Sequence, residues 1–290
     1  MYVSFNSGDN WHRVGAEASS NCDDAFLDVD CSLGDDMVRQ ILSVHWDESG
    51  DGTLYVGTQS AGVARLTGLN AIMAGGTIEQ MQDLRWEWIN SGLGPLTERI
   101  VPEIKARNGK LYCLLTGNAP HFTNNDYVGV YVFDAASSTW SLKKGVVNHH
   151  PDIGASYDLW AYPTSFDIDS QGNMWLVDIE TNWNYLASGV WKSADDGETW
   201  DRVLQFTFPY HITCVSDRVY ASGARSISHI GNAGWGDGGA MYSDDGGATW
   251  QKNEDLPLLS NLNSVVVDPN DETKVFYTFF GGGMMHGPRP

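Results

Sequence analysis

The chain has 290 residues, of which 42% are hydrophobic and 19% are charged, so it is long and apolar enough to bury a substantial core. This composition excludes a disordered chain, whose apolar content would be lower. The formal net charge is −20, and a charge of this size repels nucleic acid and anionic membranes, so we expect neither as a partner.

A short segment, 2–14, opens the chain with the pattern of two strands around a turn. Thereafter one alternating strand recurs five times, at 41–45, 100–104, 165–168, 212–215 and 264–267. A second strand follows each, at 53–56, 110–113, 173–176, 218–221 and 274–277, often across a glycine-containing hairpin turn. A third strand starts at Gly62, Gly129, Gly189, Gly239 and Gly283, and a fourth strand, such as 200–203, comes next.

Four strands every ~45–60 residues are typical of a β-propeller blade. We therefore predict an all-β fold in one domain, 1–290, with five four-stranded antiparallel blades. The boundaries are a half blade at 1–16, blades at 39–92, 98–145, 163–205 and 210–256, and a closing blade at 260–290. The N- and C-terminal segments would share the closing blade, which leaves no exposed sheet edge. An incomplete part of a larger propeller is the alternative.

An eight-residue frame, Ser-x-Asp-x-Gly-x-Thr-Trp, occurs at 193–200 and again at 243–250. Weaker copies lie at 4–11 and 133–140. The aspartate can accept hydrogen bonds from the turn, the glycine permits a positive φ, and the tryptophan can fill the gap between sheets. Each member of the frame therefore has a structural role, and we do not expect these aspartates to be catalytic.

The frame resembles the Asp-box (BNR) repeat of sialidase-like and xyloglucanase-like β-propellers. The C-terminal run 279–288 is similar to the end of bacterial BNR-repeat proteins, and the resemblance covers the repeat framework but not the long loops. It implies a carbohydrate-active protein that is extracellular or periplasmic and acts on a polysaccharide or oligosaccharide. We predict no cofactor and no metal site, because the histidines of the loops lack the spacing of a familiar metal site. Sialidase activity itself is not expected, because the Arg-Ile-Pro element is interrupted by Val101 and the blades number five.

The long insertions indicate where a site lies. In a four-stranded meander, the turns after the first and third strands lie at one end of the sheet, and the other connections lie at the opposite end. The Asp boxes follow third strands, whereas we place all long insertions at the opposite end, at 15–40, 117–128, 145–163, 180–188 and 222–238. Long loops on a rigid scaffold commonly carry function.

These insertions hold acids, histidines and aromatic residues. A glycoside hydrolase needs two carboxyl groups, ~5–5.5 Å apart for retention or ~6.5–9.5 Å for inversion. We predict Asp152 and Glu180 as this pair, with Asp158 and His150 as further catalytic candidates. The predicted substrate-binding residues are Trp160, Trp183, Trp235, Tyr157, Tyr185, His211 and Arg225.

Two other functions fit the same residues. A non-catalytic glycan-binding or assembly-scaffold propeller would use the aromatic loops equally well, because the fold alone does not decide function. A polysaccharide lyase would use His149, His150, His211, Tyr157 and Arg225 to abstract a proton and neutralise charge. The high negative charge favours a neutral glycan over a polyanionic one.

The four cysteines fall into two pairs with different surroundings. Cys22 and Cys31 share a loop and could form a small disulfide, whereas Cys113 and Cys214 lie in apolar strand patterns and are expected to be buried thiols. No signal peptide or apolar run of about 18 residues is present. Since the chain begins inside a repeat, we expect either that a leader and upstream sequence were removed or that the chain is a piece of a longer propeller protein.

Overall fold

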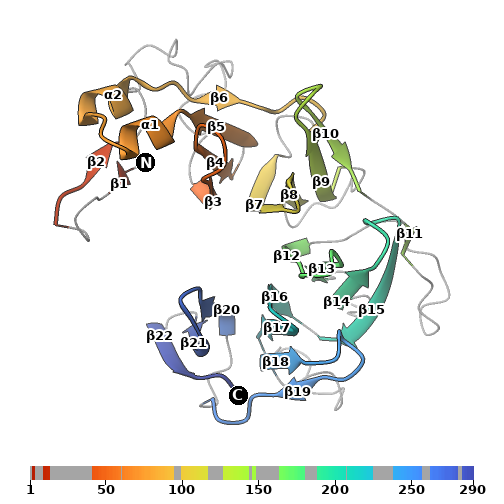
Figure 1. Ribbon diagram of the computed structural model, residues 1–290. Helices are drawn as coiled ribbons and strands as arrows, with labels where there is room; N and C mark the ends of the chain where they lie inside the picture. Colours follow the sequence, from red (N-terminus) through yellow and green to blue (C-terminus); the bar gives the residue numbers. More distant parts are fainter. Residues whose placement is uncertain are drawn as a thin grey trace. The chain divides into compact units, whose positions relative to one another are not determined.

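The computed structural model describes residues 2–3, 9–13, 41–59, 61–94, 99–116, 127–143, 146–147, 163–179, 188–206, 208–224, 238–256, 262–279 and 283–290. The fold is all-β, and its small antiparallel sheets are the blades of a five-bladed β-propeller, as the repeat predicts (Figure 1). The chain divides into two compact units. Unit 1 comprises Met1–Cys113 with Tyr131–Ser141, and unit 2 comprises Leu114–Val130 with Leu142–Pro290.

Unit 1 contains the first blade and most of the second. The first blade pairs β3 (Ile41–Asp47), β4 (Thr53–Thr58), β5 (Val63–Thr67) and β6 (Glu87–Trp88) in chain order. The second pairs β7 (Ile100–Arg107), β8 (Lys110–Thr116), β9 (Gly129–Asp134) and β10 (Thr139–Leu142). Before them, β1 (Tyr2–Val3) and β2 (His12–Arg13) form a separate two-stranded sheet.

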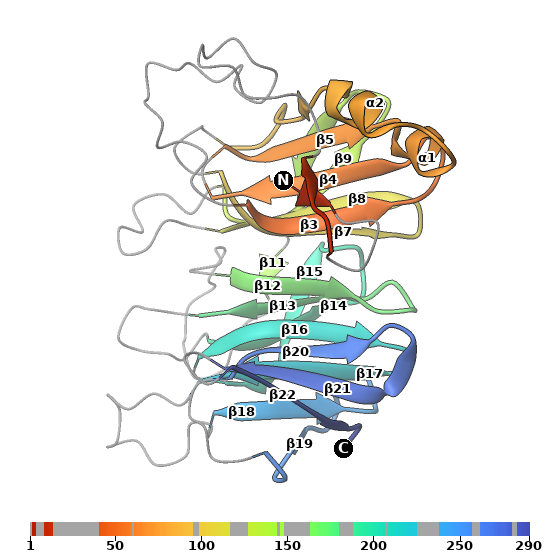
Figure 2. The ribbon, with the colours of Figure 1, turned by 90° about the vertical axis from the view of Figure 1, so that its left-hand side faces the viewer.

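Two short helices, α1 (Leu69–Met73) and α2 (Ile78–Asp83), separate β5 from β6 and were not predicted (Figure 2, orange). Thr77 and Gln80 form a capping box at the start of α2, since each side chain accepts a hydrogen bond from the other residue's backbone N–H. This insertion follows a third strand. The expectation that all long insertions lie at the opposite end is therefore wrong for the first blade.

Unit 2 holds three successive blades. The third blade contains β12 (Pro163–Ile168), β13 (Met174–Asp178), β14 (Gly189–Ser193) and β15 (Thr199–Gln205). The fourth contains β16 (Pro209–Val215), β17 (Arg218–Gly223), β18 (Gly239–Ser243) and β19 (Gln251–Lys252). The last contains β20 (Leu262–Asp268), β21 (Asp271–Phe279) and β22 (Gly283–Pro288). β16 lies between β12 and β20 (Figure 2). An additional strand, β11 (Val146–Val147), pairs in parallel with β15, within a range that we predicted as a loop.

Apolar side chains fill the space between the blades of unit 2. Trp175 and Val177 of β13 pack with Ile212 and Cys214 of β16 in one buried cluster. Tyr220 of β17 packs with residues of β20 and β21 in the next cluster. Cys113 and Cys214 are free and buried, as predicted. Cys22 and Cys31 lie outside the described residues.

Hydroxyl groups add polar links between blades. Ser43 of β3 donates a hydrogen bond to the carbonyl of Val101 in β7 at 3.3 Å, and the Ile212 N–H of β16 donates one to Ser165 of β12 at 3.2 Å. The blades approach closely here, because a Cβ added to Gly57 of β4 would lie 2.5 Å from the Val101 carbonyl oxygen of β7. Serine and glycine therefore stand where larger side chains would separate the sheets.

The chain ends carry β1 and β2 at the start and the three-stranded sheet β20–β22 at the finish. A single closing blade made from both ends stays a prediction. The tryptophan of the N-terminal Asp-box copy differs from those of the other copies. Trp11 is 62% exposed, whereas Trp140 and Trp200 are buried, because β1 and β2 are two residues each and offer little surface to pack against.

Candidate functional site

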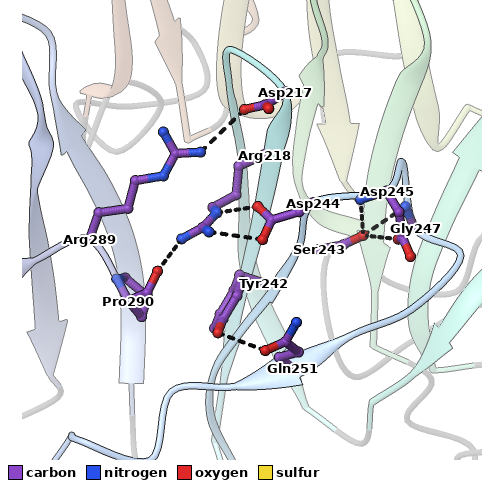
Figure 3. A network of polar contacts seen from close by, with 10 residues as sticks. All are labelled: Asp217, Arg218, Tyr242, Ser243, Asp244, Asp245, Gly247, Gln251, Arg289 and Pro290. Carbon is purple, nitrogen blue, oxygen red and sulfur yellow. Dashed lines mark hydrogen bonds and ion pairs between the residues drawn. The ribbon is translucent and has the colours of Figure 1, made fainter.

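The two complete Asp boxes have the same hydrogen bonds. Asp195 accepts from the Thr199 N–H at 2.8 Å, from the Thr199 hydroxyl at 2.6 Å and from the Ser193 hydroxyl at 2.8 Å. Asp245 does the same with Thr249 and with Ser243, whose hydroxyl lies beside the carboxylate (Figure 3). Gly197 has φ 83° and Gly247 has φ 92°, a conformation that other residues rarely adopt. The predicted turn geometry is confirmed.

These hydrogen bonds keep the Asp-box carboxylates ionised. Hydrogen bonds from the threonine hydroxyl, then the threonine N–H, then the serine hydroxyl lower the pKa of Asp195 and of Asp245 to about 2. A carboxyl with such a pKa is a poor proton donor near neutral pH. The geometry therefore supports the structural role that we assigned to both aspartates.

Charged groups also join strands at the end of unit 2 that carries the Asp-box turns, which we call the Asp-box end. Arg218 forms a two-point ion pair with Asp244, and its guanidinium carbon lies 4.5 Å from the centre of the Tyr242 ring (Figure 3). It also donates to the backbone carbonyl of Pro290, and Arg289 pairs with Asp217. The Asp-box end thus joins β17, β18 and the segment after β22.

At the opposite end, four first strands begin with the same irregularity. In each, the pairing register with the second strand shifts after the first residue, at Ile41, Pro163, Pro209 and Leu262. Such a β-bulge inserts one residue and re-aims the side chains beside it. The inserted residue and its successor are Leu42 and Ser43, Thr164 and Ser165, Tyr210 and His211, and Asn263 and Ser264.

The β16 bulge differs from the other three, because His211 occupies the position that serine holds in β3, β12 and β20. Tyr210 precedes it, and burial raises the pKa of the Tyr210 phenol. Thr164 donates to the Pro209 carbonyl at 3.1 Å, which places the β12 bulge beside the β16 bulge. His211 is the one predicted site residue within the described part of the chain, and it lies at the end where we predicted the site.

The other predicted site residues lie outside the described residues: Asp152, Glu180, Asp158, His150, Trp160, Trp183, Trp235, Tyr157, Tyr185 and Arg225. Their segments are nevertheless joined to described strands. The segment 148–162 leads into Pro163, 180–187 connects Ile179 with Ser188, and 225–237 connects Ala224 with Gly238. The register pairs Pro163 with Asp178, and Asp178 with Gly189, so these connections enter and leave at one end of the sheets.

Sequence reasoning missed two polar residues at this end. Asp178 ends β13 and is 2% exposed, and Thr116 ends β8 and is 5% exposed. Both lie just beyond the second strands predicted at 110–113 and 173–176, and neither falls in a predicted long insertion. Among the described residues, no group of three histidine, cysteine or acidic side chains is placed to hold a metal ion.

No family model matches the chain, and no curated protein matches it. Solved structures do show the fold. The chain is 12% identical to a GH74 xyloglucanase from Xanthomonas campestris, with a TM-score of 0.53, over 82% of this chain and 33% of that one. It is 13% identical to the extracellular domain of the hybrid two-component system BT3049 from B. thetaiotaomicron, with a TM-score of 0.52, over 86% and 27%.

A third similar structure is YCF48 bound to D1 peptide, at 11% identity and a TM-score of 0.53, over 98% of this chain and 69% of that one. The chain thus spans a third or less of the xyloglucanase and of BT3049, but more than two thirds of YCF48. At these identities the likeness shows the propeller fold alone. None of the helices in the described ranges has the length and apolar character that a membrane crossing needs.

Proposed function

We propose that the chain is a carbohydrate-active propeller that hydrolyses a polysaccharide with two carboxyl groups from its long loops. One observation carries the proposal: the Asp-box carboxylates are bound within turns, whereas the acid-bearing segments join the sheets at the opposite end, beside Tyr210 and His211. The likeness to a GH74 xyloglucanase supports it as an analogy of fold.

The chemistry assigns different tasks to the two carboxyl groups. One protonates the oxygen of the leaving sugar, and the other acts as a nucleophile or activates a water molecule. Asp152 and Glu180 are the proposed pair, with Asp158 and His150 as further candidates. Trp160, Trp183 and Trp235 would stack on sugar rings, and Tyr157, Tyr185, His211 and Arg225 would bind hydroxyl groups. We place the protein outside the cytoplasm, as BT3049's domain is.

Hydrolysis of xyloglucan and of other neutral β-glucans tests the proposal. Release of reducing ends is measured for the wild type, Asp152→Asn and Glu180→Gln. Each variant should lose about 10²–10⁴-fold in turnover. The exposed Asp83→Asn and Glu254→Gln serve as matched controls and should keep wild-type turnover. Wild-type turnover in both loop variants would refute this pair.

A binding function is the second candidate, because the chain spans most of YCF48, which was solved with a bound peptide. A binding propeller would use the same loops without chemistry. Glycan-array and peptide-array binding by the wild type, with no product from any glycan, would favour this reading. Unsaturated uronate products, seen by ultraviolet absorbance, would instead indicate a lyase.

A further inference from the structure

We propose that Tyr210 and Asn263, at the starts of two neighbouring strands of unit 2, form a binding site for one sugar ring of a neutral glycan. The site deepens the proposed function and rests on it for the class of ligand. Each of the two residues is the one that a β-bulge inserts into the first strand of its blade. Both belong to strands and not to the acid-bearing connections.

Hydrogen bonds join the bulges of unit 2 in chain order. β16 lies between β12 and β20 (Figure 2). The Thr164 hydroxyl of β12 donates at 3.1 Å to the carbonyl of Pro209, the residue before Tyr210. On the other side, Ser222 of β17, in the same sheet as β16, donates to the Asn263 carbonyl at 3.1 Å. The bulges that carry Tyr210 and Asn263 therefore lie side by side.

The backbone around Tyr210 is fixed both before and after the bulge. The Phe208 carbonyl accepts a hydrogen bond from the Ala224 N–H at 3.0 Å. Beyond the bulge, the Ile212 N–H donates to the Ser165 hydroxyl of β12 at 3.2 Å. A binding residue on a rigid strand holds its geometry better than one on a loop, and less ordering is needed when a ligand binds.

The bulge itself does not dictate which residue it inserts. The residue after the inserted one is serine in three of the four bulges, and in β3 and β12 it bonds the neighbouring blade. The inserted position varies much more. It holds Leu42, Thr164, Tyr210 and Asn263. Such variety at one backbone position indicates that the sheets accept different side chains there, so the residue at this position can serve recognition.

The two side chains offer complementary groups. Asn263 is exposed, and its amide has no hydrogen bond to any residue that the structure describes. An amide supplies two donors and an acceptor. Tyr210 is half-buried, and burial raises the pKa of its phenol. Its ring adds a flat apolar face to a hydroxyl that can donate and accept.

These groups fit an uncharged sugar ring better than an acidic one. The apolar face of the sugar would lie against the tyrosine ring, and its hydroxyl groups would exchange hydrogen bonds with the amide. Neither side chain carries a charge near neutral pH, so the pair offers no counter-charge to a carboxylate or sulfate. The net charge of −20 opposes an anionic ligand further.

Calorimetry with thio-linked cellotetraose, a neutral β-glucan fragment that resists hydrolysis, tests the site. Tyr210→Thr, which copies the β12 bulge, and Asn263→Ala should each raise the Kd about tenfold, with the Tm within about 2 °C of wild type. Tyr210→Phe keeps the ring and should raise the Kd only about threefold. Asn270→Ala is the matched control, because Asn270 is also exposed but lies beyond the opposite end of β20. It should bind as the wild type does.

The outcomes separate this site from the proposed hydrolysis. An unchanged Kd in either Tyr210→Thr or Asn263→Ala would overturn the site, as would unfolding of both Tyr210→Thr and Tyr210→Asn, which copies the β20 bulge. If these variants bind more weakly but the wild type hydrolyses no glycan, the site stands and the hydrolysis falls. If the wild type hydrolyses a β-glucan and the variants keep its KM, the hydrolysis stands and the site falls. A wild type that neither binds nor hydrolyses overturns both.

Discussion

At the scale of single residues, most carboxylates that the structure describes at the Asp-box end already have partners. Asp195, Asp245 and Asp244 each accept two or more hydrogen bonds. These bonds stabilise the turns, so their loss should appear as lost stability and not as lost activity.

The Asp-box charge makes one pH-dependent contribution to stability. Because the folded-state pKa of Asp245 is lowered to about 2 from 3.8, the stabilisation is present above about pH 4 and is lost as the pH falls through 2. Asp245→Asn should lower the Tm at pH 7 by about 3 °C. In urea titrations the deficit should shrink between pH 4 and pH 2, whereas Asp83→Asn should show no deficit at any pH.

Replacing His211 in the β16 bulge distinguishes a binding role of this residue from a structural one. Since Ser43, Ser165 and Ser264 occupy the same register position, the framework accepts serine there. His211→Ser should therefore keep the wild-type Tm within about 2 °C and reduce oligosaccharide affinity about tenfold, measured by calorimetry. His286→Ser, on exposed β22, is the matched control. An unchanged affinity for His211→Ser would remove His211 from the site.

At the scale of elements, Arg218 links three of them. It pairs with Asp244 beside β18, stacks on Tyr242 and donates to the carbonyl of Pro290. Only 11% of its side chain is exposed, so this pair is less screened than a surface pair.

Lysine cannot replace that arginine. Arg218→Lys keeps the charge but loses the two-point geometry and the stacking, and should cost about 1–2 kcal/mol in urea unfolding. Arg65→Lys is the control, because its partner Glu87 is 59% exposed, and it should cost about 0.5 kcal/mol or less. Equal losses of unfolding free energy in the two variants would show that the two-point geometry and the stacking of Arg218 add no stability.

The strands were predictable, whereas several details of their pairing were not. Alternating apolar residues and glycine-containing turns mark the first and second strands, so their order and hairpins followed from local chemistry. The parallel strand β11 is two residues long and depends on pairing with β15. A pairing between such distant segments cannot be predicted from the local sequence pattern. The bulges at Tyr210 and Thr164 are likewise properties of paired strands, not of single ones.

Little of the candidate site could be predicted in the same way. The meander predicts which end carries the long connections, and His211 lies in the bulge at that end of β16, but its role stays a prediction. Asp178 and Thr116 were missed because each closes an apolar strand, and burial at a strand end depends on neighbouring segments. The helical insertion α1–α2 was missed because helices of five and six residues carry little periodic signal.

At the scale of the whole molecule, the net charge of −20 should discriminate between glycans. A neutral xyloglucan oligosaccharide should bind with an affinity that hardly depends on salt. A polygalacturonate oligosaccharide should bind more weakly at about 0.02 M salt than at about 0.3 M, because added ions screen the repulsion. Calorimetry at both salt concentrations measures this. Tighter binding of polygalacturonate at low salt would contradict the prediction and favour the lyase.

The recurring bulge has a practical consequence for engineering. The second residue of each pair is constrained, since Ser43 and Ser165 make hydrogen bonds between blades. The inserted residue Thr164 is constrained in the same way by its bond to the Pro209 carbonyl. A combinatorial library restricted to the other inserted residues of unit 2, Tyr210 and Asn263, would therefore vary the surface beside the long connections while leaving the Asp-box turns alone.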